Sequence, residues 1–132
     1  MLYLATPDDF RGDAYGWLTN QMSHVLAGLG GAWLVMTLAA AFGVTGHSLE
    51  RIAGGPVSAP ALLGLIAAVL ASGTLEVVQL RRGGALTDSL ADFAFVLAGA
   101  VWTVAGGTLL LWLLVAAALV AGTTRRSRER RD

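Results

Sequence analysis

The sequence contains no cysteine and no lysine, so all nine of its basic residues are arginine. The absence of cysteine excludes a disulfide framework and a thiolate metal site. Charge is also scarce: 14% of the residues are charged, against roughly 25% in a typical soluble domain. Because 55% of the residues are hydrophobic, a water-soluble domain is the weaker interpretation of this composition.

Several motifs that would indicate an enzyme or a nucleic-acid-binding protein are missing. The glycine pairs that begin at residues 30, 54, 83 and 106 follow no predicted strand and lack Walker or Rossmann spacing. No nucleophile elbow and no repeat of 20 to 50 residues is present. No folded basic surface with interleaved aromatic residues is predicted either. The sequence therefore favours a binding or modulatory protein over an enzyme, with no cofactor and no nucleic-acid partner.

Three long apolar runs are the main feature that the chain does contain. They cover residues 22–44, 60–80 and 93–122, and each reaches the length of about 20 residues that a membrane-crossing helix needs. A two-helix hairpin is the alternative for the third run, which contains Gly106 and Gly107. Because no polar turn interrupts this run and each half would be too short to span, one long, tilted or bent helix is favoured. We predict an all-α membrane protein, a single domain over 1–132 with three transmembrane helices.

The segments at the two ends of the chain bear on its orientation. The polar N-terminal segment 1–20 has acidic residues where a cleavable signal peptide would have basic ones, so the first helix is expected to remain. With three crossings, the tail 123–132 lies on the side opposite the N-terminus, and the arginines divide three to six in favour of the tail's side. The positive-inside rule then predicts an inner-membrane protein with its N-terminus outside and its C-terminus in the cytoplasm. The tail is interpreted as a stop-transfer signal, with attraction to anionic lipid head groups as the alternative.

Polar side chains gather near the ends of the apolar runs, at one membrane face. The candidate site consists of His24, Glu76, Gln79, Arg82, Asp88 and Asp92. Carboxylates inside a membrane are costly and normally face a partner within the bundle. Arg81 or Arg82 is the expected partner of these carboxylates, with His24 next. Small residues at 27, 28, 31, 32 and 98–100 share the same helix faces, which would allow the helices to pack closely.

Each of these residues also has a purely structural interpretation. Glu76 and Arg82 could form a helix-end ion pair, and His24 could be a packing residue held by a hydrogen bond. If the site performs chemistry, Glu76 would be the general acid or base, Arg82 the anion-binding group and His24 the proton partner. A metal bound by His24, Glu76, Asp88 and Asp92 would have suitable ligand types. The spacing matches no particular metal, so we predict none.

This pattern resembles the VanZ-like family of small integral membrane proteins, over roughly residues 20–107. The family has a His at the start of one helix, a later helix that ends in Glu-x-x-Gln, and an Arg followed by an Asp before the last core helix. The matching residues here are His24, Glu76, Gln79, Arg82, Asp88 and Asp92. The chain departs from the family at Asn20-Gln21, where the family often has Asp-Lys, and at Asp92, where it has Asn. The connection from Gln79 to Arg82 is also shorter, and the usual additional N-terminal helix is missing.

The resemblance implies a role in the cell envelope and in glycopeptide (teicoplanin) resistance, with no established reaction to carry over. The sequence therefore predicts a VanZ-like inner-membrane protein whose outer-face polar cluster binds or modulates a lipid, a lipid-linked precursor or an amphiphile. Its expected partners are membrane lipids, and beyond them a lipid-linked envelope precursor or other membrane proteins. The alternative is a structural accessory subunit of a membrane complex or a holin-like lysis protein, whose small-residue faces serve helix association.

Overall fold

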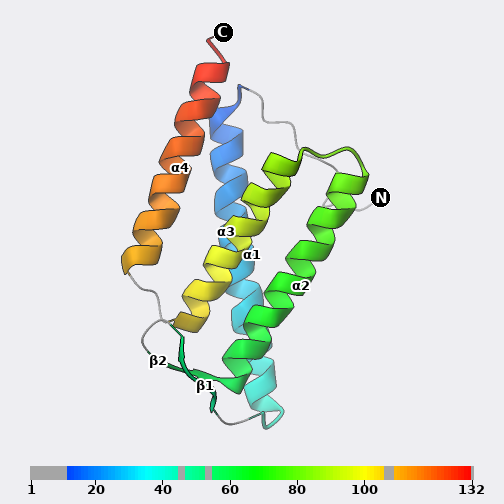
Figure 1. The fold of residues 1–132 in the computed structure, drawn as a ribbon, viewed down its shortest axis with the longest axis vertical. Helices are drawn as coiled ribbons and strands as arrows, with labels where there is room; N and C mark the ends of the chain where they lie inside the picture. The colour runs from blue at the N-terminus through cyan, green and yellow to red at the C-terminus, as the bar shows by residue number, and fades with distance from the viewer. Residues whose placement is uncertain (1–11, 45–46, 53–54, 106–108, 132) are drawn as a thin grey trace.

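The computed structural model describes residues 12–44, 47–52, 55–105 and 109–131. The polar residues 1–11 and the glycine pair at 106–107 lie outside the described residues. The helices are α1 (Ala14–Ala41), α2 (Ala59–Arg81), α3 (Leu86–Ala105) and α4 (Leu109–Glu129). Two short antiparallel strands, β1 (His47–Ile52) and β2 (Gly55–Ser58), lie in the connection from α1 to α2. The helices run alternately down and up the bundle (Figure 1).

Helix starts and stops follow local signals in the sequence. The side chain of Asp13 caps α1 by accepting a hydrogen bond of 2.9 Å from the backbone N–H of Gly16. Ser58 caps α2 by accepting from the backbone N–H of Ala61, and a proline stands in the first turn, where its missing N–H costs nothing. After α2 the chain turns at Gly83, whose φ of 95° is readily adopted only by glycine.

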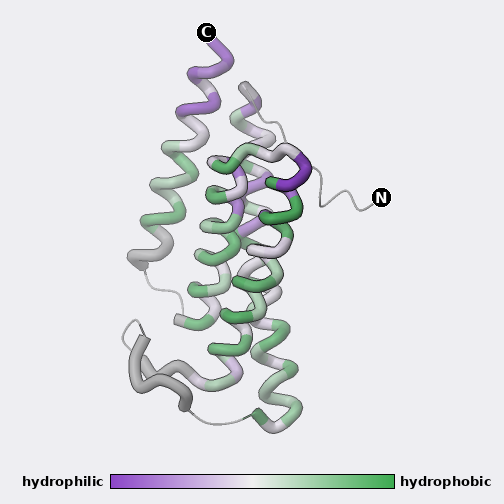
Figure 2. The backbone as a smooth tube through the Cα atoms, turned by 45° about the vertical axis from the view of Figure 1, so that its right-hand side comes forward, coloured by the Kyte–Doolittle hydropathy of each residue, from purple (hydrophilic) through white to green (hydrophobic). Residues whose placement is uncertain are grey.

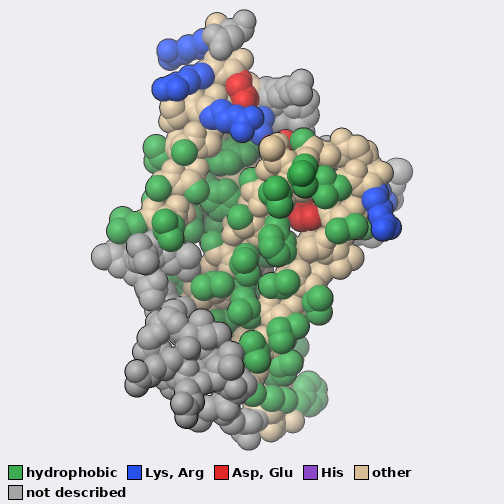
Figure 3. Space-filling model, in the orientation of Figure 1, with side chains coloured by type: hydrophobic (Ala, Val, Ile, Leu, Met, Phe, Trp, Pro, Cys, Tyr) green, Lys and Arg blue, Asp and Glu red, His purple; other side chains and the backbone are tan. Residues whose placement is uncertain are grey.

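The predicted class, an all-α membrane protein with three candidate transmembrane helices, is confirmed. α1, α2 and residues 86–104 of α3 are long and apolar enough to cross a membrane. With a rise of 1.5 Å per residue, the 23 residues of α2 extend about 35 Å, enough for a hydrocarbon core of about 30 Å. The helices are hydrophobic along most of their length, and hydrophilic residues concentrate at one end of the bundle (Figures 2 and 3).

The single long helix expected over 93–122 is instead divided between α3 and α4. A hairpin is disfavoured by the sequence only if its first helix begins at Phe93, because that helix would be too short to span the membrane. α3 actually begins at Leu86 and includes Asp88 and Asp92, so that it reaches 20 residues before the chain reverses. The two carboxylates are tolerated inside the helix because both have partners in the bundle. α4 then runs back antiparallel to α3 (Figure 1).

This reversal places the tail at the end of the bundle where α1 begins, so the predicted location of the tail at the opposite end is wrong. A β-carbon on Gly12 would lie 3.6 Å from the Cα atom of Arg130. Arg126 forms a hydrogen-bonded ion pair of 2.8 Å with Asp88, in the first turn of α3. The beginning of α1, the turn between α2 and α3, and the end of α4 therefore lie at one end of the molecule (Figure 1).

Small residues let α1 pack tightly against its neighbours, as the sequence pattern predicted for Gly28 and Gly99. A β-carbon on Gly28 would lie 1.9 Å from the carbonyl oxygen of Val96, and one on Gly99 would lie 2.0 Å from that of Val25. Contacts this short leave room only for glycine, so α1 and α3 approach to backbone contact. Elsewhere in the bundle, the Trp17 ring occupies the space beside Gly122 and meets Phe95 edge to face, with ring centroids 6.1 Å apart.

Candidate functional site: a groove with one polar end between α1 and α2

A cavity of about 460 Å³ lies between α1 and α2 and extends to Val96 of α3. Its polar end is formed by Asn20, Ser23 and His24 of α1 and by Ser72, Glu76 and Gln79 of α2. The rest of the cavity is lined mainly by small apolar side chains, which are Ala27, Gly28, Gly31, Ala67, Ala68 and Ala71, together with the larger Val35 and Leu75. The cavity therefore changes from polar to apolar along the direction of the bundle axis.

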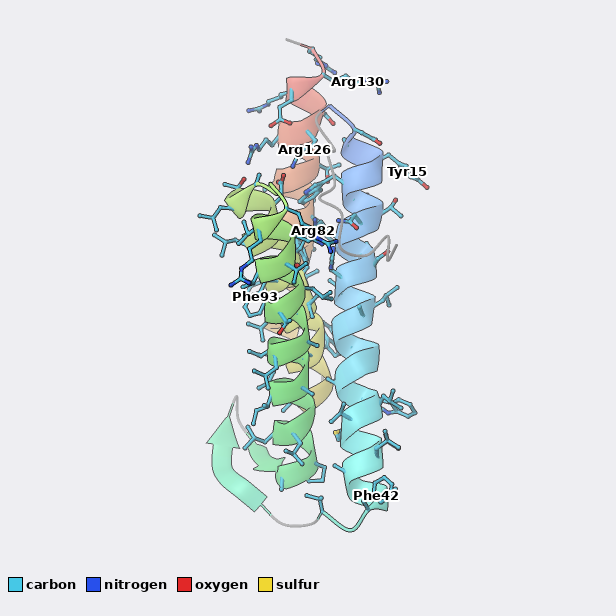
Figure 4. All side chains as sticks on the ribbon, turned by 90° about the vertical axis from the view of Figure 1, so that its right-hand side faces the viewer. Tyr15, Phe42, Arg82, Phe93, Arg126 and Arg130 are labelled. Atoms are coloured by element: carbon cyan, nitrogen blue, oxygen red, sulfur yellow. The ribbon has the colours of Figure 1, made fainter. Side chains whose placement is uncertain are left out.

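Helical spacing produces this gradient. On α1, positions 20, 24, 27 and 31 recur at intervals of three or four residues, and these residues lie on one face. On α2, Ser72, Glu76 and Gln79 follow the same intervals. Because the two helices are antiparallel (Figure 4), the beginning of α1 meets the end of α2, where each contributes its polar residues. The sequence predicts His24, Glu76 and Gln79 at a common site, and the structure places all three here.

Asp92 of α3 joins this polar end to α1. Its Oδ1 atom accepts a hydrogen bond of 2.6 Å from the Nε2 atom of Gln21, and its Oδ2 atom lies 3.5 Å from Nε2 of His24. Asp92 is 5% exposed and Gln21 is 1% exposed. The carboxylate partners expected from the sequence were Arg81 or Arg82, with His24 second. The contacts of Asp92 described above come instead from Gln21 and His24, both on α1. His24 was the second expected partner.

Glu76 occupies the polar end with one carboxylate oxygen unsatisfied. The residue is 7% exposed, has a hydrogen bond with the side chain of Ser89 and lies within electrostatic range of Asp92. Its Oε2 atom has no hydrogen-bond partner among the described residues, and neither has the Oγ atom of Ser72, which is 5% exposed. Leaving a buried polar atom unsatisfied costs about 1–3 kcal/mol, and more when the group is charged. Two such atoms on one helix face therefore mark the side of the groove where a donor from outside the chain would bind.

No ion pair of Glu76 with an arginine occurs within the described part of the chain. Arg82 caps the end of α2 at the same end of the bundle (Figure 4) and has interactions of its own. Its side chain is exposed and does not line the groove. The predicted Glu76–Arg82 pair is therefore not found, because Arg82 follows the last helical residue of α2 while Glu76 is directed into the bundle.

Asp88 belongs to a second polar region, away from the groove. Arg126, whose side chain is 8% exposed, bonds Asp88 at 2.8 Å and lies 3.6 Å from Glu129. These residues line a wide polar depression of about 1010 Å³ between the beginning of α3 and the end of α4. The positive and negative groups in it are largely paired with each other. This region attaches α4 to the bundle, and the predicted cluster is thus split between two places.

The residues of these regions that sequence reasoning missed include Gln21, Ser72, Ser89 and Arg126. The first three could have been found from spacing, since each lies three or four residues from a residue that was identified. Ser72 precedes Glu76 by four, Ser89 precedes Asp92 by three, and Gln21 precedes His24 by three. Arg126 gave no local signal, because its role depends on the reversal of the chain between α3 and α4.

The polar groups that line the groove are carboxylate, hydroxyl, amide and imidazole groups. Within the described ranges, no group of three or more His, Cys, Asp and Glu side chains is arranged to hold a metal ion. An acceptor-rich end beside an apolar slot is suited to holding a molecule with one polar and one apolar part.

Searches of protein-family profiles, curated proteins and solved structures find no match to the chain. The resemblance to the VanZ-like family accordingly stays a prediction.

Proposed function

We propose that the protein binds one amphiphile from the surrounding membrane in the groove between α1 and α2. The head of the amphiphile lies at the polar end, beside Ser72 and Glu76, and its hydrocarbon chain follows the small apolar residues. The observation that carries this proposal is the pair of buried, unpartnered oxygen atoms on α2 at the top of an apolar slot. Binding a donor there would remove a cost that the folded chain otherwise bears.

The size and composition of the groove support this function. Its volume of about 460 Å³ lies within the range of roughly 300–1,000 Å³ common for small-molecule sites. Alanine and glycine side chains leave a smooth channel without branched groups to obstruct a hydrocarbon chain. Gly31 contributes most directly to this space, because a β-carbon there would meet no atom within 4 Å.

The beginning of α1, the end of α4 and the polar end of the groove are proposed to face the cytoplasm. Seven of the nine arginines belong to the last residue of α2, the residue that follows it and the tail, all at one end of the described structure; the other two are Arg11, which lies outside the described residues, and Arg51. This asymmetry favours a cytoplasmic location of that end in a plasma membrane. The sequence-based expectation of an outer-face cluster and an external N-terminus assumed that the tail lies at the opposite end of the bundle from the beginning of α1. The proposed cytoplasmic location of the polar end replaces that expectation.

A cell-envelope role of the VanZ-like type is part of this proposal only through the residues that the chain shares with the family pattern. His24, Glu76 and Gln79, which carry the resemblance, are the residues at the polar end of the groove. The structural-subunit alternative is less favoured, because the tightest glycine contacts, at Gly28 and Gly99, are already used between helices of the same chain. They are not left free for a partner protein.

Adjacent glycines provide a matched test of the proposal. Gly31→Phe should fill the groove, whereas Gly30→Phe places the same side chain on an exposed position that does not line it; a β-carbon at either site meets nothing within 4 Å. The full chain in phosphatidylcholine vesicles would be irradiated with dodecanol that carries a diazirine on its chain. Because the chain has no lysine, trypsin releases α1 in peptide 12–51 and α2 in peptide 52–81.

We expect Gly31→Phe to reduce the labelling of these two peptides about tenfold, while Gly30→Phe leaves it at the wild-type level. Equal labelling of the two variants would show that the probe reacts with the lipid-facing surface and not with the groove, and it would overturn the proposed function.

A further inference from the structure

We propose that the amphiphile bound in the groove has a primary ammonium head group, which donates hydrogen bonds to Oε2 of Glu76 and Oγ of Ser72. This inference rests on the proposed function, because it names the ligand class of the same groove. The two oxygens belong to residues four apart on α2, so they lie one helical turn from each other on one face. An ammonium group carries three N–H donors and no acceptor, and can bond both oxygens at once.

Charge selects a cation over an anion at this end of the groove. The ionisable side chains that face it are Glu76 from α2, His24 from α1 and, behind His24, Asp92 from α3. The one group among them that can become positive, His24, has its Nε2 atom 3.5 Å from a carboxylate oxygen of Asp92. Two carboxylates against one imidazole make the site favourable for a cation and unfavourable for a phosphate.

Phosphate and carboxylate head groups are normally bound by arginine or lysine. Within the described residues, no arginine lines the groove. Arg81 and Arg82 are exposed at the end of α2, and Arg126 is bound to Asp88 at 2.8 Å in the separate polar depression. A molecule with both a phosphate and an ammonium would therefore have to place its ammonium, not its phosphate, between Ser72 and Glu76.

Hydrogen bonding to the two oxygens distinguishes a primary ammonium group, which has N–H donors, from a quaternary one, which has none. A trimethylammonium group has the same charge but no N–H, so it would leave the Ser72 hydroxyl and the Glu76 oxygen unsatisfied. Quaternary ammonium groups are instead bound by aromatic cages. The described residues that line the groove include no Phe, Tyr or Trp side chain. The groove thus favours a head group that donates hydrogen bonds.

The test uses four photoreactive amphiphiles with an identical diazirine-bearing dodecyl chain. Their head groups are ammonium, trimethylammonium, phosphate and hydroxyl, and each is incorporated into phosphatidylcholine vesicles with the full-length protein. Labelling is measured on tryptic peptides 12–51 and 52–81 for wild type, Gly31→Phe, Glu76→Gln and Ser72→Ala. Glu129→Gln in α4, outside the groove, makes the same change as a control.

In the wild type we expect the ammonium probe to label these peptides at least tenfold more than the phosphate or trimethylammonium probes, because a charge-assisted hydrogen bond distinguishes them. Glu76→Gln should reduce ammonium labelling about tenfold, and Ser72→Ala severalfold. Both should reduce the labelling by the hydroxyl probe much less, because a neutral hydroxyl loses no charge-assisted hydrogen bond, and the hydroxyl labelling that remains shows that the groove is intact. Glu129→Gln should have no effect.

Two failures can be told apart. If no probe gives labelling that Gly31→Phe removes, the groove does not bind amphiphiles and the proposed function is wrong. If the labelling is removed by Gly31→Phe but the phosphate or trimethylammonium probe labels as strongly as ammonium, the function holds and the ammonium inference is wrong. If Glu76→Gln also loses hydroxyl labelling, Ser72→Ala decides: unchanged ammonium labelling in that variant contradicts the inference, and a selective loss supports it.

Discussion

Replacing Gly28 with alanine should be far more damaging than the same replacement two residues later. The β-carbon that Gly28→Ala introduces would lie 1.9 Å from the carbonyl oxygen of Val96, a backbone atom that cannot rotate away. A β-carbon at Gly30 would meet no atom within 4 Å. Both substitutions raise helix propensity equally, by up to about 1 kcal/mol in water. The difference between the two variants therefore measures the closeness of α1 to α3.

The size of the effect follows from the separation that Gly28→Ala forces. To bring its contact from 1.9 Å to 3.0 Å, the shortest that real β-carbons tolerate, the two helices must move apart locally by about 1.1 Å. The same displacement would lengthen the hydrogen bond from Gln21 to Asp92 from 2.6 to about 3.7 Å, and that from Thr103 to the Leu29 carbonyl from 3.1 to about 4.2 Å. Neither would then be a hydrogen bond.

Overpacking costs about 1–3 kcal/mol, and the lost hydrogen bond to the carboxylate about 1.5–3 kcal/mol. Because these contributions overlap, we expect Gly28→Ala to lower the free energy of unfolding by about 2–5 kcal/mol. Reversible unfolding in mixed micelles, with helicity followed during titration with a denaturing detergent, measures it. Free energies of unfolding for Gly28→Ala and Gly30→Ala that agree within about 0.5 kcal/mol would refute the close approach of α1 and α3.

Three further outcomes are expected. A double-mutant cycle of Arg126→Gln with Asp88→Asn should give a coupling free energy of about 1–2 kcal/mol, because the arginine is buried. The exposed Arg125–Glu129 pair should give a coupling of less than about 1 kcal/mol. Equal couplings for the two pairs would show that Arg126 does not hold α4 to the bundle. Asp92→Ala should lower the free energy of unfolding in the same micelle assay by about 3 kcal/mol, and Asp92→Asn, which keeps an acceptor oxygen, by less than half of that; equal losses would contradict the hydrogen bond from Gln21. Single cysteines at the exposed positions Thr87 and Ser127 should react with an impermeant thiol reagent from the same side of sealed vesicles, and reaction from opposite sides would disprove the return of α4.

The helices were predictable because membrane spans depend on the length of apolar runs, a property of the local sequence. The close contacts at Gly28 and Gly99 could also be predicted from the sequence, since small residues on a membrane helix indicate where another helix approaches. His24, Glu76 and Gln79 could be assigned to one site because helix ends on the same side of a membrane must meet. In each case the information lies within one helix or in the order of the helices.

The beginning of α3 and the position of the tail were not predictable in the same way. The sequence predicts that Asp88 and Asp92 precede or begin the third helix at one membrane face, but both lie within α3, and Asp92 is stabilised inside the bundle by Gln21, 71 residues earlier in the chain. Likewise, Arg126 and Asp88 are 38 residues apart. A charge that belongs to a loop cannot be distinguished from a charge with a buried partner until the partner's position is known. The error at the start of α3 made a hairpin seem too short, and so displaced the tail as well.

The return of α4 also determines how the chain can be inserted into a membrane. In the proposed orientation, α3 and α4 form a hairpin with both polar ends on the cytoplasmic side, so none of the tail arginines would have to be carried across the bilayer. α4 has only 14 apolar residues before its threonines and arginines, from 109 to 122, so it gains most of its stability in the membrane from packing on helices already present. Trp17 can complete its packing only when Gly122 has been synthesised, 105 residues later (from 17 to 122). α1 is therefore fully packed only after α4 has been made.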